Sequence, residues 1–197
     1  MSSASHVAYL LEELERELDR QGSPFSSVAA PPVDPRRLDE AEERVGRSFP
    51  AELRAWWLWH DGSVPQRGRL STHKIGVGAW WPYPLEQALK EWAWWSLDEN
   101  WGDEPFPATW VPFAGTQSKW LNAKLELSTP DRLVMGVVAL PGELEEYGAT
   151  VSLTFPALIQ GWIEFLRAGH ATWDAGEDCW IYRMPPPAEY HPYLFWG

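Results

Sequence analysis

The chain has little cysteine, few basic residues and no long apolar run. Its 197 residues contain one cysteine, Cys179, which excludes an intramolecular disulfide framework and suits a reducing compartment. No stretch approaches the roughly 18 apolar residues that a membrane span requires. Residues 1–20 also lack the basic segment followed by an apolar one that marks a secretory signal. We therefore expect a cytoplasmic protein with no membrane partner.

The scarcity of basic charge restricts the class of partner. The chain has 16 Lys and Arg against 28 Asp and Glu, a formal net charge of −12. Nucleic acid is thereby disfavoured, because phosphate contacts need a basic face. Residues 91–108 carry five acids and no base, and residues 141–178 carry a net charge of −6. Solvated loops would explain both segments; alternatively, they form an acidic face that attracts a basic protein.

Sequence motifs of catalysis and metal binding are also missing. The chain has no Gly-rich phosphate loop, no Cys/His metal spacing and no nucleophile elbow. His60 and Asp61 resemble a catalytic pair, but successive helical residues point about 100° apart and cannot orient each other. We therefore predict no catalytic residue, no metal site and no cofactor. The many carboxylates leave a glycosidase pair open as an alternative.

Tryptophan is abundant, with 15 residues. Trp56 and Trp57 lie in an apolar helix and are expected in the core. A domain of this size needs fewer buried tryptophans than the chain contains, because each buries roughly 150–250 Å². Exposed aromatic residues beside carboxylates are typical of protein interfaces. The predicted partner-binding residues are Trp92, Trp94, Trp95, Asp98, Glu99, Trp101, Asp103, Glu104, Glu143, Glu145 and Glu146.

Hydrophobic periodicity gives the predicted elements. Apolar residues at helical spacing predict helices over residues 7–22, 35–46, 50–62, 85–95 and 155–168. Strand composition and turn signals predict a strand or hairpin over residues 70–81, and strands over 109–114, 119–127, 132–140 and 179–184. By composition, residues 22–33 are a linker. Residues 185–197 are predicted to form an irregular tail whose aromatic side chains pack on the body.

Several of these segments, in this order, resemble the SUKH superfamily, which comprises Smi/Knr-like cell-wall regulators and bacterial immunity proteins. The resemblance begins with "EAEERVG" and "RSFPAELRAWWLWHDG", an acidic helix, a glycine and an apolar helix that ends in Asp-Gly. It continues through "ATWVPFAG" and "VMGVV" to the helical segment "VSLTFPALIQGWIEFLRAG". The matching stretch runs from Val33 to Gly169.

The resemblance implies an α+β fold, with helices packed on one antiparallel sheet of about four to six strands. We expect an N-terminal helix and linker at residues 1–32, the SUKH-like domain at 33–170, and an aromatic and Pro-rich C-terminal extension packed on it at 171–197. The implied function is protein binding without catalysis, most simply an immunity-type protein that occludes a basic toxin, such as a nuclease. A Smi/Knr-like regulatory adaptor is the alternative. Exposed tryptophans leave a third alternative, a carbohydrate-binding or glycosidase domain. The oligomeric state stays open.

Overall fold

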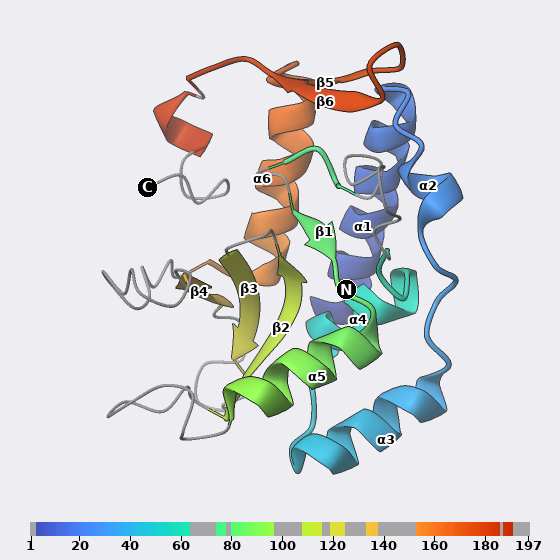
Figure 1. Ribbon diagram of the computed structural model, residues 1–197, viewed down its shortest axis with the longest axis vertical. Coiled ribbons are helices and arrows are strands. Elements are labelled where there is room, and N and C mark those ends of the chain that lie inside the picture. Colours follow the sequence, from blue (N-terminus) through green and yellow to red (C-terminus); the bar gives the residue numbers. More distant parts are fainter. Residues whose placement is uncertain are drawn as a thin grey trace.

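Helices pack on a small antiparallel sheet in the computed structural model, which describes residues 3–63, 74–77, 80–96, 108–115, 119–124, 133–137, 153–185 and 187–190 (Figure 1). The helices are α1 (Ser3–Arg20), α2 (Phe25–Val28), α3 (Pro35–Val45), α4 (Ala51–Trp59), α5 (Leu85–Trp95), α6 (Phe155–Arg167) and the 3₁₀ turn η3 (Ala188–Tyr190). The strands are β1 (Trp81–Pro82), β2 (Trp110–Gly115), β3 (Lys119–Lys124), β4 (Leu133–Val137), β5 (Ala171–Asp174) and β6 (Cys179–Tyr182).

The predicted α+β class is confirmed. β1, β2, β3 and β4 pair in that order, each antiparallel to its neighbour. The register between β2 and β3 shifts between Pro112 and Ala114. Proline has no N–H to donate to the ladder, so an irregularity beside Pro112 is expected. Residues 125–132 and 138–152 lie outside the described residues, and the strand number of the whole sheet therefore stays a prediction.

The N-terminal helix α1 is part of the core. Its apolar side chains recur at helical spacing, and Val7, Leu11, Leu14 and Leu18 are fully buried. The helix contacts both α4 and α6 along its length (Figure 1). Glu17, also buried, is paired with Arg20 of the same helix and with Arg167 of α6. The helix thus contributes both apolar packing and a compensated buried charge.

The predicted linker between α1 and α3 is instead a packed segment. It contains the short helix α2, whose Phe25 is fully buried and stacks on Trp59 with ring centroids 5.5 Å apart. This large aromatic side chain fixes a stretch that is otherwise rich in small residues and proline. The segment then enters α3, where the Asp34 carboxylate accepts a hydrogen bond from the Arg36 N–H as an N-cap.

The tryptophan-rich helix α4 is the centre of the core, as predicted for Trp56 and Trp57. Both side chains are fully buried. Their indole N–H groups donate to backbone carbonyls, Trp56 to Phe113 at 3.2 Å and Trp57 to Tyr83 at 3.1 Å. These bonds satisfy the polar group of each ring and tie the helix to β2 and to the segment after β1.

The strand or hairpin predicted over residues 70–81 is a tight turn in its described part, where the Ile75 N–H donates to the Trp80 carbonyl at 2.9 Å. An extended strand was the wrong alternative for residues 74–77. In the described part of this segment, residues 74–77 form a bend and β1 has only two residues. Gly76 has φ +71°, and the ring of Trp180 lies where its Cβ would be, with atoms as close as 2.6 Å. The bend therefore places Ile75 and Val77 in the core, and backbone hydrogen bonds to Trp80 hold it.

The C-terminal part is a helix followed by a hairpin. In α6, Thr154 is the N-cap and its hydroxyl accepts the Ala157 N–H. The hairpin β5–β6 lies at the opposite end of the molecule from α3 (Figure 1). The sequence predicted β6 but missed β5. In the described part of the chain, every helix is too short or too polar to cross a membrane.

Candidate partner-binding site

The predicted partner-binding residues begin on the last turns of α5. One face of this helix packs into the core through the buried side chains of Leu85, Ala88 and Leu89. The first N–H of α5 is capped by a residue distant in sequence: the Asp61 carboxylate accepts a hydrogen bond from the Leu85 N–H at 2.7 Å. This bond joins the end of the α4 segment to the start of α5, and so helps to set the direction in which the α5 tryptophans project.

Trp92 and Trp94 face different environments. Trp92 is half-buried against the core, and its indole N–H donates to the Ala108 carbonyl at 2.9 Å. Trp94 is 51% exposed. Residues two apart on a helix point about 200° apart, which accounts for the difference. Trp92 therefore anchors the helix end to the segment before β2, while Trp94 presents apolar surface outward.

The other predicted site residues belong to parts of the chain that the structure does not describe. These are the side chain of Trp95 and the whole of Asp98, Glu99, Trp101, Asp103, Glu104, Glu143, Glu145 and Glu146. They remain predicted partner-binding residues.

One carboxylate at this end of α5 has an unusual environment. Burial raises the pKa of Glu91, because desolvation disfavours the charged form. Earlier on the same helix, Glu86 is exposed and pairs with Arg44 of α3 at 3.2 Å. Of these two carboxylates, Glu91 is the one whose charged form is disfavoured by the fold.

The tryptophans are mostly interior in the described part. Trp56, Trp57, Trp80 and Trp162 are fully buried, and Trp94 is the tryptophan with a mostly exposed side chain among those described. The sequence predicted the burial of Trp56 and Trp57 from their apolar helix but did not separate Trp92 from Trp94.

His60 and Asp61 do not form a catalytic pair. The two ring nitrogens of His60 lie 3.0 Å from the Ala30 carbonyl oxygen and 3.2 Å from the Glu15 carboxylate. Asp61 instead binds the Leu85 N–H and Arg37. The two side chains thus point to different elements, as their adjacent positions predicted, and each holds the chain around the end of α4. Among the described residues, no three His, Cys, Asp or Glu side chains gather as a metal site would require.

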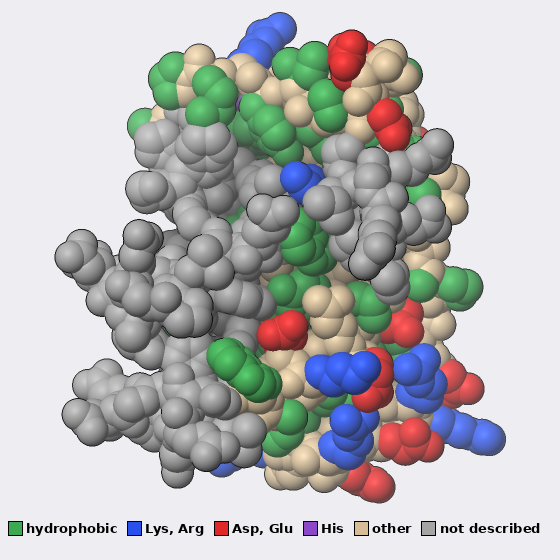
Figure 2. Space-filling view, in the orientation of Figure 1, with side chains coloured by type: hydrophobic (Ala, Val, Ile, Leu, Met, Phe, Trp, Pro, Cys, Tyr) green, Lys and Arg blue, Asp and Glu red, His purple; other side chains and the backbone are tan. Residues whose placement is uncertain are grey.

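The charged surface near α3 is mixed in sign. Acidic and basic side chains alternate over the end of the molecule that α3 occupies (Figure 2). Four Arg–carboxylate pairs join α3 to its surroundings, one each through Arg37 and Arg44 and two through Arg54. Such a surface has no strong field of one sign, so the excess acid of the chain is carried elsewhere, chiefly by residues 91–108 and 141–178.

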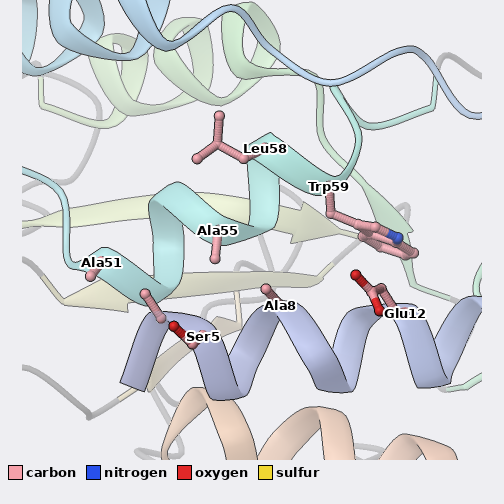
Figure 3. Close-up of a pocket in the computed structure, with 8 residues that line it drawn as sticks. Ser5, Ala8, Glu12, Ala51, Ala55, Leu58 and Trp59 are labelled. Atoms are coloured by element: carbon pink, nitrogen blue, oxygen red, sulfur yellow. The ribbon is translucent and has the colours of Figure 1, made fainter. Parts of the chain in front are cut away.

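Sequence reasoning missed an apolar groove between α1 and α4. It has a volume of about 420 Å³ and is lined by Ala4, Ser5, Ala8, Glu12, Ala51, Ala55, Leu58 and Trp59 (Figure 3). The available signal was the set of small residues at helical spacing on each helix. Nothing in the sequence, however, indicated that these two helices lie side by side.

Comparison with known proteins identifies the relatives of the central part of the chain. Residues 32–155 match the sequence model of the SMI1 / KNR4 family (SUKH-1). A search of curated proteins finds no significant match. The matched stretch covers α3 through the β4 region and ends where α6 begins.

Proposed function

Because the chain belongs to the SMI1 / KNR4 family (SUKH-1), we propose that it is a protein-binding domain without catalytic activity, which neutralises a basic toxin domain by covering its functional surface. We place the binding domain at residues 33–170, with residues 1–32 and 171–197 as terminal extensions packed on it, and the protein in the cytoplasm. The chain would act by occlusion and need no cofactor.

The distribution of charge carries this proposal. Residues 91–108 and 141–178 together account for all but one unit of the net charge of −12. The first of these segments starts on α5, where the half-exposed Trp94 lies. An aromatic anchor next to carboxylates suits a basic partner, because the ring provides buried area and the acids speed the encounter. A nuclease that binds polyanions would be such a partner.

Charge neutralisation tests the steering role of the first segment. The partner is first captured on the wild-type chain from the native lysate and identified. Asp98, Glu99, Asp103 and Glu104 are then replaced together by their amides. The association rate with the partner, measured by stopped flow at low salt, should fall several-fold, because four attractive charges are lost.

A matched variant controls for net charge alone. Four exposed acids outside the two acidic segments change to their amides in this control: Asp19, Glu40, Glu43 and Glu189. The control should slow association much less than the first variant. Equal rates for wild type and the first variant would remove the steering role.

A regulatory adaptor is the second candidate, and the match to the SMI1 / KNR4 family model favours it as much as an immunity role. An adaptor's partner need not be basic. Identification of the captured protein separates the two: a toxin domain supports immunity, whereas a signalling or envelope enzyme supports the adaptor. A carbohydrate-binding function has less support, because among the described tryptophans Trp94 alone is mostly exposed, and a stacking platform uses several rings.

A further inference from the structure

The groove between α1 and α4 is a separate feature from the α5 surface. The two helices run in the same direction, so Ser5, Ala8 and Glu12 of α1 lie opposite Ala51, Ala55 and Trp59 of α4 in turn (Figure 3). Alanine and serine leave space between the helices that longer side chains would fill. The opening is therefore a result of side-chain size along both helices.

The groove has the shape and polarity of a helix-docking site. Ala8 and Ala51 are exposed at its edges, and Ala55 is buried in its floor. Two larger α4 side chains also line it: Leu58, with 40% of its surface exposed, and Trp59, which lies next to Glu12 (Figure 3). Small residues on two adjacent helices allow a third helix to approach closely, and its apolar side chains would cover Leu58.

The charge at this end of the groove is acidic. Among the described residues that line the groove, Glu12 is the one ionisable residue, and none of the described residues forms an ion pair with its carboxylate. Its neighbour Arg16 pairs with Glu13 instead, at 2.6 Å. Asp19 continues the same face of α1 by helical spacing, whereas the Glu15 carboxylate is taken up by Trp59 and His60. An occupant would therefore gain from a basic side chain beside Glu12.

From this geometry we propose that the α1–α4 groove binds an amphipathic helix of a partner protein, with the apolar face of that helix on Ala8 and Ala55 and a lysine or arginine beside Glu12. A second copy of this chain is a poorer occupant. Each copy carries a net charge of −12, and a symmetric contact would bring Glu12 and Asp19 of one copy near those of the other. The inference goes beyond the proposed function, since the groove lies on α1 and α4 and not on α5.

Alanine methyl groups provide a direct test. Ala4, Ala8, Ala51 and Ala55 line the groove, while the exposed Ala93 lies on α5. The full-length protein is labelled with ¹³C-methyl alanine and titrated at low salt with a synthetic amphipathic helical peptide that has leucine on one face and lysine at one end. The four groove methyl signals should shift with one saturable curve, and the Ala93 signal should not shift.

Matched variants and a second peptide localise the binding. Replacing Ala8 and Ala51 together by glutamine should weaken peptide affinity at least tenfold, because both exposed positions would project into the groove. Ala93→Gln should leave affinity unchanged. A peptide with glutamate in place of lysine should bind wild type at least fivefold more weakly, a comparison that needs no variant protein.

Four results would overturn the inference. These are an absence of saturable shifts at the groove alanines, equal affinity of the Ala8/Ala51 variant, equal affinity of the glutamate peptide, and concentration-dependent shifts of the groove alanines without peptide, which would indicate a second copy. A shift confined to Ala93 would place the peptide on α5, overturning the groove assignment while leaving the proposed function intact.

Discussion

At the scale of single residues, the structure explains why a glycine, Gly62, follows Asp61 after α4. Its φ is +68°, and a Cβ at this position would overlap the Pro84 nitrogen and lie 2.7 Å from the Tyr83 carbonyl oxygen. Gly46, at the end of α3, has a similar φ of +72°, but nothing lies within 4 Å of the point that its Cβ would occupy. A side chain at either position would therefore be strained by the left-handed backbone, but only at position 62 would its Cβ also collide with neighbouring backbone atoms.

This difference predicts unequal costs for the same substitution. Gly46→Ala should lower the free energy of unfolding by about 1–2 kcal/mol, the cost of a left-handed alanine. Gly62→Ala should lower it by about 1–3 kcal/mol more, because backbone atoms of residues 83 and 84 must also move. Urea denaturation of both variants measures the difference. Equal costs would show that the turn relaxes freely.

Glu91 predicts a pH-dependent effect. Burial raises the pKa of Glu91 in the folded state, so the contribution of this group to stability is fully present below its unfolded-state pKa and is lost as pH rises through the raised value. Glu91→Gln removes the charge of this partly buried side chain. The variant should therefore gain stability relative to wild type at about pH 7 and gain little at about pH 3.5, where both side chains are neutral.

Urea denaturation at the two pH values checks this prediction. Glu43→Gln, at an exposed position of α3, controls for the loss of one negative charge from an acidic protein. A gain at about pH 7 no larger than that of the control would contradict a burial penalty at Glu91.

At the scale of elements, α1 is expected to be necessary for folding although it precedes the family match. Val7, Leu11, Leu14 and Leu18 are fully buried against the rest of the chain. Burial of each such side chain is worth about 1.5–3 kcal/mol, and typical domain stability is only about 5–15 kcal/mol. A variant that begins at residue 22 should lose cooperative thermal unfolding in circular dichroism. A cooperative transition near the wild-type temperature would show that α1 is an independent addition.

The sequence predicted the helices and strands better than the contacts between them. Helical spacing located α1, α3, α4, α5 and α6, since periodicity and caps such as Asp34 are local. It failed at Gly76, where the bend depends on the ring of the distant Trp180. It also failed at Phe25, which is fixed by stacking on Trp59. Both failures arise from contacts between distant segments, which composition and spacing do not contain.

The candidate site shows the same limit. Aromatic and acidic composition selected Trp92 and Trp94 equally, yet one is anchored to the Ala108 carbonyl and the other is mostly exposed. Trp56 and Trp57 were predictable as core because their helix is apolar over most of its circumference. The α1–α4 groove was not, because it depends on which helices are adjacent.

At the scale of the whole molecule, the charge distribution and the family membership are both consistent with protein binding. The described surface around α3 balances acid against base, whereas two other segments hold nearly all of the net charge of −12. Membership of the SMI1 / KNR4 family (SUKH-1) supplies the protein-binding context. A binder with this charge would associate quickly with a basic domain and slowly with an acidic one.

The salt dependence of association therefore tests the central claim most directly. The rate at which the wild-type chain binds its captured partner is measured from about 20 to 500 mM NaCl, where the Debye length falls from roughly 20 Å to about 4 Å. We predict that the association rate falls at least tenfold over this range while the dissociation rate changes far less. An association rate that is unchanged by salt would contradict recognition of a basic partner by the acidic segments.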